Sequence, residues 1–390
     1  MGMIIKNKVQ YGNQTSTTED SYTKEEFNNI ITDSVENSNT ATLSHLKDSY
    51  FIYNDILYIA TSDISIGNTI IPNTNCKKVS ISEELQKAQD VSPGGDNELL
   101  EQLINGTITS FSGSMTQIRA GLFYNCTSLR SVSFPACSYI GQEAFCNCFD
   151  LKSISFPACA SINMNAFNAC SSLKNINFPM CNIINTSAFA YCVALTTINL
   201  PECSILGNYA FGSCVALTTI NLPECSILGQ YAFQSCRALT TVSLPKCTYI
   251  DNGGFKECSS LTTINLPECS YIGQSAFESC RALTVVSLPK CISTQYRTFA
   301  SCYSLTTINL PKCSYIGTLA FFNCYNLVSL YLTNSSYVTL DASYAFSSTP
   351  IGGYSASAGR YGSIYVPASM LESYKTMTNW TYFSSRFVGI

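Results

Sequence analysis

Apolar residues recur every 22 positions through the middle of the chain, and each recurrence has the period of a short strand. The stretch that begins at Leu195 reads LTTINL, in which the fourth and sixth residues are apolar and the fifth is polar. That alternation predicts a strand with one buried side. Pro201 follows directly and has no backbone N–H, so the strand is expected to end there. Gly207 is expected to permit the next turn, and the residues up to Cys214 to return the chain as a short helical or irregular segment.

Ten phenylalanines spaced by 22 residues mark ten such units, and the template L-x-x-L-x-L-x-x-N/C of a leucine-rich repeat fits them. Each unit of such a solenoid contacts only its neighbours, so we expect like residues to stack on one another. Successive coils ~4.8 Å apart predict a rod of roughly 50 Å. The phenylalanines are Phe123, Phe145, Phe167, Phe189, Phe211, Phe233, Phe255, Phe277, Phe299 and Phe321. The expected interior ladder of one unit is Leu195, Ile198, Leu200, Cys203, Phe211 and Cys214.

Two consecutive units have almost the same sequence. Residues 193–214 and 215–236 differ only at Asn208, which becomes Gln230, and at Gly212, which becomes Gln234. Both copies would make the same contacts in a solenoid, so the duplication is tolerated. The repeats are therefore expected to build a scaffold and to carry no chemistry on their own.

The 21 cysteines follow the same period. Ten stand three residues after a repeat phenylalanine and nine stand two residues after a proline, so that only Cys76 and Cys146 fall outside the two series. A disulfide framework has irregular spacings, and a metal site needs ligands that converge on a point. We therefore predict two buried ladders of free thiols, packed as small apolar side chains, with no metal and no cofactor.

Composition excludes several classes of function. The net charge of −4 gives no electrostatic case for nucleic acid. No apolar run approaches the roughly 20 residues that a membrane-spanning helix needs, so no membrane insertion is expected. The first residues show no signal peptide. His45 is the single histidine, and the acidic residues show no recurring pair, so we expect no enzyme.

The outward positions of the predicted strands carry threonine and asparagine, as in Thr218, Thr219 and Asn221. One interpretation is a ladder of residues with high strand propensity and cross-strand hydrogen bonds. A second is a surface of hydroxyl and amide groups that binds carbohydrate or protein, and a third is a regular array that orders water. The sequence alone leaves the three open.

Tyrosines crowd the C-terminal third, next to an irregular unit. Residues 291–302 read CISTQYRTFASC, with Thr294 where other units have isoleucine or leucine. Local inconsistency in a repeat often marks function, and tyrosine offers a large rigid surface with a polar tip; ordinary drift near a cap is the alternative. The candidate ligand-binding residues are Tyr296, Tyr303, Tyr315, Tyr325 and Tyr331.

The repeats degrade toward both ends, which divides the chain. We predict an N-terminal helical and extended region over 1–45, with a helix in residues 22–37, and a small β-module over 46–90. A linker over 91–98, reading VSPGGDNE, leads to the solenoid with its N-terminal cap over 99–346. Residues 347–390 form a C-terminal cap, with one amphipathic helix over 368–386 that shields the open sheet edge.

The unit LTTINLPECSYIGQSAFESC resembles the BspA-like leucine-rich repeats of bacterial surface proteins, over residues 118–346. The closing segment from Gly362, GSIYVPASMLESYKTMTNWTYFSSRF, is similar to the end of such arrays. The family's usual unit is one residue longer between the proline and the Ile-Gly pair, and here a cysteine replaces a polar residue. The resemblance implies a binding protein without catalytic activity, whose partner is a protein or carbohydrate on a cell surface.

Two extracellular settings are expected from these resemblances. Residues 50–85 resemble, more weakly, a β-module of phage and prophage tail proteins, which would make the chain a tail-associated protein that recognises a bacterial surface. A homotrimer through the N-terminal region would fit that setting. The alternative is a bacterial cell-surface adhesin that binds host proteins or glycans.

Overall fold

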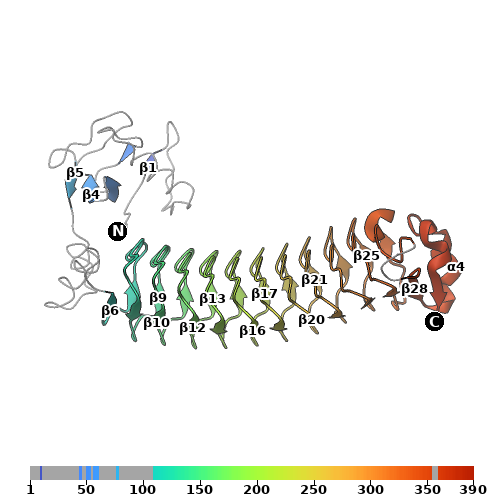
Figure 1. Ribbon diagram of the computed structural model, residues 1–390, viewed down its shortest axis with the longest axis horizontal. Coiled ribbons are helices and arrows are strands. Elements are labelled where there is room, and N and C mark those ends of the chain that lie inside the picture. The colour runs from blue at the N-terminus through green and yellow to red at the C-terminus, as the bar shows by residue number, and fades with distance from the viewer. Residues whose placement is uncertain are drawn as a thin grey trace.

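A computed structural model describes residues 109–353 and 359–390, together with five short strands nearer the N-terminus. The described chain winds into a rod of parallel coils that are stacked along one axis (Figure 1). Each coil has a three-residue strand, a two-residue strand and an irregular turn. The predicted solenoid of 22-residue coils is confirmed: Thr197 of one coil pairs with Asn175 of the coil before it.

One side of the rod consists of the longer strands, in parallel sheets of three, two, two and six strands. These are β6 (Ser110–Ser112), β8 (Ser131–Ser133), β10 (Ser153–Ser155), β12 (Asn175–Asn177), β14 (Thr197–Asn199), β16 (Thr219–Asn221), β18 (Thr241–Ser243), β20 (Thr263–Asn265), β22 (Val285–Ser287), β24 (Thr307–Asn309), β26 (Ser329–Tyr331), β28 (Ser363–Val366) and β29 (Phe387–Gly389). In the repeats the strand ends before the proline, as predicted.

The second side is one parallel sheet of eleven two-residue strands. These are β7 (Gln117–Ile118), β9 (Tyr139–Ile140), β11 (Ser161–Ile162), β13 (Ile183–Ile184), β15 (Ile205–Leu206), β17 (Ile227–Leu228), β19 (Tyr249–Ile250), β21 (Tyr271–Ile272), β23 (Ser293–Thr294), β25 (Tyr315–Ile316) and β27 (Thr339–Leu340). The third side is the turn that carries the repeat phenylalanine, and we call it the turn side.

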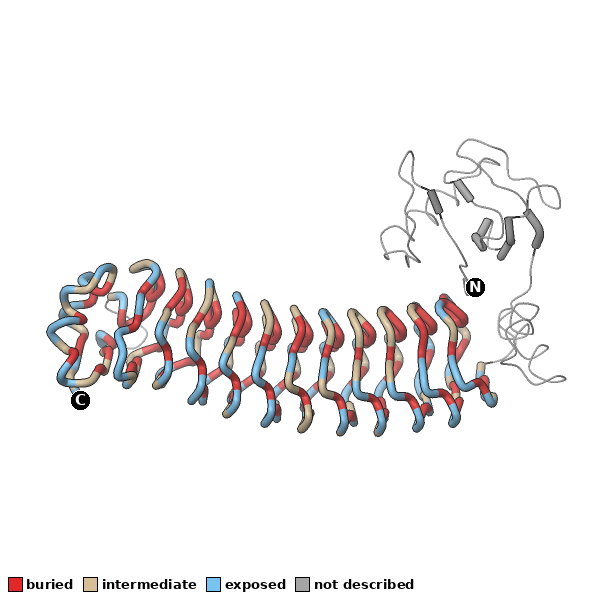
Figure 2. Tube along the Cα trace, turned by 180° about the vertical axis from the view of Figure 1, so that it is seen from behind, coloured by how far each residue is buried: buried red, intermediate tan, exposed pale blue. Residues whose placement is uncertain are grey.

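The interior of the rod consists of ladders of like residues, which Figure 2 shows as a buried column within every coil. Of the six expected ladder positions, Ile198 is half-buried and the other five have no exposed surface. The Phe211 ring lies parallel to those of Phe189 and Phe233, with centroids 5.3 and 5.4 Å away. Each coil thus covers the apolar side of the next.

The two cysteine series have different hydrogen bonds. The Cys214 thiol donates to the carbonyl of Phe189 in the preceding coil (3.2 Å), whereas the Cys203 thiol donates to the carbonyl of Ile205 in its own coil (3.5 Å). A thiol is small, apolar and a weak donor, so it can fill the ladder and also satisfy a carbonyl. All twenty cysteines from Cys126 to Cys324 are buried thiols outside any disulfide.

Gly207 serves the turn in a different way from the one predicted. The left-handed residues of its coil are Tyr209 and Ser213, with φ of 54° and 61°. Gly207 itself lies against the preceding coil, where a Cβ would come within 2.7 Å of the carbonyl carbon of Asn185. Close backbone approach therefore requires this glycine, rather than a positive φ.

The single helix predicted over 368–386 is wrong in its extent. The turn of the last coil contains η1 (Ser343–Phe346), and the closing segment contains η2 (Ala368–Met370), α4 (Leu371–Thr376) and η3 (Trp380–Arg386). Met377 is extended after α4, and Asn379 is left-handed with φ of 62°. This break gives the segment two short pieces in place of one continuous amphipathic helix.

The break lets side chains of the closing segment form hydrogen bonds with backbone groups at the end of the eleven-stranded sheet. Trp380 donates its indole N–H to the carbonyl of Val338 (2.8 Å), and the Tyr374 hydroxyl accepts from the Val338 amide (3.0 Å). The Asn379 amide donates to the carbonyl of Leu340 in β27 (2.9 Å). A straight helix would not bring all three side chains to that edge. On the side of the longer strands, β28 pairs with β26 and β29 pairs with β28, so these two strands extend that sheet beyond the last coil.

Near the N-terminus, β1 (Val9–Gln10) pairs antiparallel with β2 (Ser44–His45). The strands β3 (Tyr50–Tyr53), β4 (Ile56–Ala60) and β5 (Cys76–Lys78) form an antiparallel sheet, in the stretch where short strands are predicted. The predicted helix in residues 22–37 and the linker over 91–98 lie outside the described residues. Within the described part, no helix has the length and apolar character to cross a membrane.

Candidate binding surface

The candidate tyrosines do not gather at one point. Tyr303 and Tyr325 form a stacked pair, one coil apart, at the corner after the turn, with ring centroids 5.1 Å apart. The Arg281 guanidinium lies 5.5 Å from the centroid of Tyr303, a favourable cation–π distance. Tyr325 is 40% exposed. This pair and its arginine form a rigid surface that solvent reaches.

The other three candidates lie elsewhere on the coil. Tyr296 is exposed on the turn side, Tyr315 points outward from β25, and Tyr331 on β26 stacks on Tyr365 at 4.4 Å. The sequence groups these residues because they are close along the chain. A 22-residue coil distributes them over its three sides, so closeness in sequence did not mean one site.

The irregular unit differs from its neighbours in the core. Thr294 is fully buried on β23, between Ile272 and Ile316, and its hydroxyl has no hydrogen-bond partner among the described residues. Thr298 stands where most units have alanine, but its hydroxyl bonds to the backbone of Gln295. The irregularity at Thr294 is therefore an unsatisfied buried group, inside the rod.

We expect the substitution Thr294→Val to raise the free energy of unfolding by about 1–2 kcal/mol, because a methyl of nearly the same shape replaces an unpaired buried hydroxyl. Thr298→Val removes a bonded hydroxyl and should lower the free energy of unfolding. Chemical denaturation of both variants measures the difference. A destabilised Thr294→Val variant would show that the hydroxyl has a role in the folded protein.

An ion-pair cluster occupies the turn side beside the irregular unit. Glu278 is 8% exposed, and its carboxylate accepts from Lys256 at 3.0 Å and from Arg297 at 2.6 Å. Burial alone would raise the pKa of Glu278, but hydrogen bonds from Lys256, Ser275 and Arg297 hold the pKa below its usual value. The sequence analysis missed this cluster, because its residues lie 19 to 22 positions apart.

The outward residues of the longer strands bond to one another. On β14, the Thr197 hydroxyl donates to the Asn175 side chain, and the Asn199 amide donates to Asn177 (2.7 Å). Because their partners lie in the neighbouring coil, these groups support the interpretation as a cross-strand ladder. Part of this surface is therefore already engaged within the protein.

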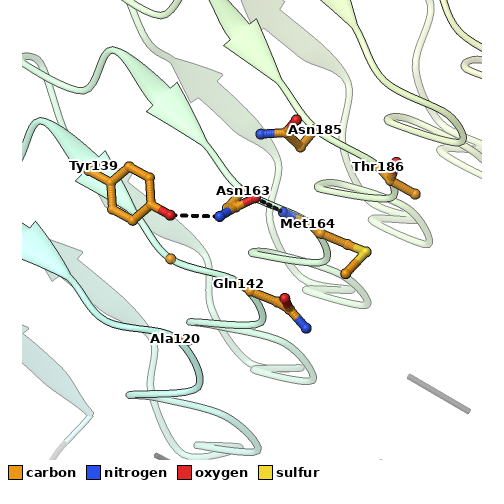
Figure 3. A pocket seen from close by; sticks show the side chains of 8 residues that line it. Ala120, Tyr139, Gln142, Asn163, Met164, Asn185 and Thr186 are labelled. Carbon is orange, nitrogen blue, oxygen red and sulfur yellow. Dashed lines mark hydrogen bonds between the residues drawn. The ribbon is translucent and has the colours of Figure 1, made fainter. Parts of the chain in front are cut away.

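Two neighbouring hollows lie in the N-terminal half of the rod, where the sequence predicted no ligand-binding residue. One lies where the short strands lead into the turns, and the other lies on the turns themselves. The first is lined by Tyr139 of β9 and by residues that directly follow β7, β9, β11 and β13, as Figure 3 shows. The Asn163 amide points to the Tyr139 hydroxyl there, at 2.6 Å, and its carbonyl oxygen accepts from the Met164 amide. Met164 and Thr186 line both hollows.

The second hollow runs along the turns, from Met164 to Gln234. One signal in the sequence could have found it. The residue after the repeat phenylalanine varies in chemical type from unit to unit, as in Asn168, Ala190 and Gly212, whereas the central residue of the longer strand is always isoleucine, valine or leucine from β8 to β26. Variation among otherwise constant repeats marks the side of the coil whose surface differs along the rod.

No group of histidine, cysteine, aspartate or glutamate in residues 109–353 and 359–390 is arranged to hold a metal ion. The cysteines run along the rod as ladders, and the thiol protons are retained. Burial raises the pKa of Cys247 to about 11 and that of Cys203 to about 12.

The family model described as BspA type leucine rich repeat region matches residues 96–218, 182–294 and 226–352, which together exceed half of the chain. The chain belongs to the BspA-type leucine-rich repeat family. BspA-type repeats are typically those of binding proteins without catalytic activity. This match supports the expectation of a bacterial surface protein, and nothing in it supports a link to phage tails.

Leucine-rich repeat proteins are among the solved structures that match the chain. A leucine-rich repeat protein from Bacteroides ovatus is 21% identical over 82% of this chain and 90% of that chain, with a TM-score of 0.57. A leucine rich cell surface protein from Faecalibacterium prausnitzii is 21% identical over 87% and 98%, with a TM-score of 0.44. The pneumococcal vaccine antigen PcpA is 15% identical over 88% and 98%, with a TM-score of 0.42. The likeness to the Bacteroides ovatus protein, at 21% identity, shows the fold alone. No curated protein matches the chain.

Proposed function

We propose that this BspA-type protein is a non-enzymatic adhesin of a bacterial cell surface, which binds host proteins or glycans through its repeat array. The family match supports this setting over the phage tail that the N-terminal resemblance suggested. The ladder residues are buried in the interior of every coil, so a partner can contact only the outward side chains, which vary from coil to coil.

One observation carries the binding role: the stacked pair of half-buried Tyr303 and exposed Tyr325, with Arg281 beside it. Stacking fixes both rings before a partner arrives, so little side-chain entropy is lost on binding. Tyrosine and arginine are the residue types that dominate binding energy at protein interfaces. Burial of the pair against a partner would therefore contribute strongly to affinity.

The full chain, immobilised on beads, is expected to retain host epithelial cells or extracellular-matrix proteins. Tyr325→Ala should weaken that binding at least about tenfold, since a central aromatic anchor contributes ~2 kcal/mol or more. Thr218→Ala, on the strand side, is the control and should change binding by less than about twofold. Equal effects of the two substitutions would remove the pair as the binding site, and a wild-type chain that retains neither probe would contradict the adhesin itself.

A further inference from the structure

The two nearly identical units differ at the second hollow. Of the two positions that distinguish 193–214 from 215–236, one is the residue after the repeat phenylalanine, Gly212 in the first copy and Gln234 in the second. Both line the hollow. The duplication therefore preserved every ladder residue and changed the lining of this surface.

The absence of a side chain at Gly212 opens the hollow. Ala190, one coil earlier, is small and buried, while the rings of Tyr191 and Tyr209 on the same surface are 55% and 38% exposed. Gln234 lies one coil later. The hollow has a volume of about 440 Å³, which lies within the range of ~300–1,000 Å³ for small-molecule sites.

One ring of the hollow is held in place from behind. Tyr209 stacks on Tyr231, with ring centroids 4.9 Å apart. The Tyr231 ring in turn lies over Gly253, where a Cβ would come within 2.2 Å of two ring carbons. A larger residue at Gly253 would displace Tyr231. The glycine therefore lets the Tyr209 ring rest on a fixed neighbour, which favours a preformed surface.

The lining contains no charged residue. Asn168 is buried, and its amide donates to Asn165 and Ser187. The polar groups that face the hollow are the Gln234 amide and the Thr186 and Ser213 hydroxyls, which both donate and accept hydrogen bonds. Tyr191 and Tyr209 offer apolar ring faces with polar tips. A charged ligand would lose hydration without a counter-charge in the hollow. The ion pairs centred on Glu278 lie on later coils and do not line it.

We propose that the hollow at Gly212 binds a neutral oligosaccharide, with a sugar face against tyrosine and its hydroxyls on the Gln234 amide and the Thr186 and Ser213 hydroxyls. A neutral sugar matches this lining because it has apolar C–H faces and a rim of hydroxyls that both donate and accept. The proposal rests on the adhesin function and names a ligand class for it. It places the glycan site on the turns, apart from the tyrosine pair at Tyr303 and Tyr325.

The duplicated unit supplies the test variant. Gly212→Gln fills the hollow with the residue that the next coil already has at this place. A Cβ at Gly212 would approach the Tyr209 carbonyl oxygen no closer than 3.4 Å, an ordinary contact, so the variant is expected to fold. The matched control is Asn208→Gln, the other difference between the copies, which is exposed and outside the hollow.

The full chain, these two variants and Tyr325→Ala are tested on an array of neutral, sialylated and sulfated oligosaccharides, and the strongest neutral ligand is then titrated in solution. We expect Gly212→Gln to weaken this ligand at least about tenfold, and Asn208→Gln and Tyr325→Ala to change it by less than about twofold. Binding of anionic glycans only, no glycan binding, or equal affinity of Gly212→Gln would each overturn the proposal. A chain that retains host cells but no neutral glycan would fail this proposal and keep the adhesin function, whereas a chain that retains neither would fail both.

Discussion

Unfolding of the repeat array is expected to become favourable as the pH rises above about 8.5, the usual pKa of a free thiol. In the folded protein, burial raises the pKa of Cys291 and Cys247 to about 11 and that of Cys203 to about 12. The cause is the same along both ladders: a thiolate inside the rod would lose its hydration. The folded chain therefore keeps protons that the unfolded chain releases.

The sign and size follow from this difference. A raised pKa in the folded state contributes stability that is complete below about pH 8.5 and is lost as the pH rises toward about 11. At about pH 9.5, one unit above the free value, each thiol costs ~1.4 kcal/mol of unfolding free energy, and most coils contain two. A few coils then exceed the ~5–15 kcal/mol that stabilises an ordinary domain.

Urea denaturation of the full chain at a series of pH values, under argon, measures the slope of unfolding free energy against pH. The double variant Cys203→Ala, Cys225→Ala should reduce that slope by about two protons, or ~2.7 kcal/mol per pH unit. Leu200→Ala also leaves a cavity but removes no thiol, and should keep the slope. Stability that stays constant to pH 10, or far fewer than 21 reactive thiols in the denatured, unreduced chain, would contradict free-thiol ladders.

The fold could be predicted because the physical constraint repeats. A residue such as Phe211 recurs every 22 positions only if each coil lies on the one before it, so period, strand and ladder follow together. The proline after the strand and the cysteine spacing were informative for the same reason. Each of these features appears in every coil and does not depend on distant parts of the chain.

The surface could not be predicted in the same way. Tyr303 and Tyr331 are close in sequence but lie on different sides of the coil, and Glu278 reaches partners 19 and 22 positions away. The turn has left-handed residues at the same two places in successive coils, such as Tyr209 and Ser213, but most of them are not glycine, so no residue type in the sequence marks them. The hollow at Gly212 depends on a missing side chain between neighbouring coils, which only the register reveals.

The single helix predicted over 368–386 was wrong for a related reason. Its apolar residues fit a helix period, but Tyr374 and Trp380 also have to reach the backbone of Val338. That requirement comes from the last coil, more than 30 residues earlier, and overrides the local preference. The period of apolar residues shows which side of a segment is buried. It does not show which backbone groups elsewhere in the protein the segment must bind by hydrogen bonds.

Phe233→Ala is expected to lower the free energy of unfolding by about 3–5 kcal/mol. The ring has no exposed surface and lies parallel to the rings of Phe211 and Phe255, at 5.4 and 5.5 Å. The site cannot collapse easily, because the Phe233 amide bonds to Gly254 in the next coil at 2.9 Å and so holds the spacing. The cavity would therefore persist, and its cost adds to the lost burial.

The position of Phe233 makes this loss larger than at an end of the rod. Stability in a solenoid is a sum of coil and interface terms, and a central coil takes part in two interfaces. Guanidinium denaturation followed by fluorescence and circular dichroism measures the loss and shows whether the two halves of the rod begin to unfold separately. Gln234→Ala on the same turn is the control and should change stability by less than about 0.5 kcal/mol. A loss at Phe233 as small as that of the control would mean that the phenylalanine ladder does not hold successive coils together.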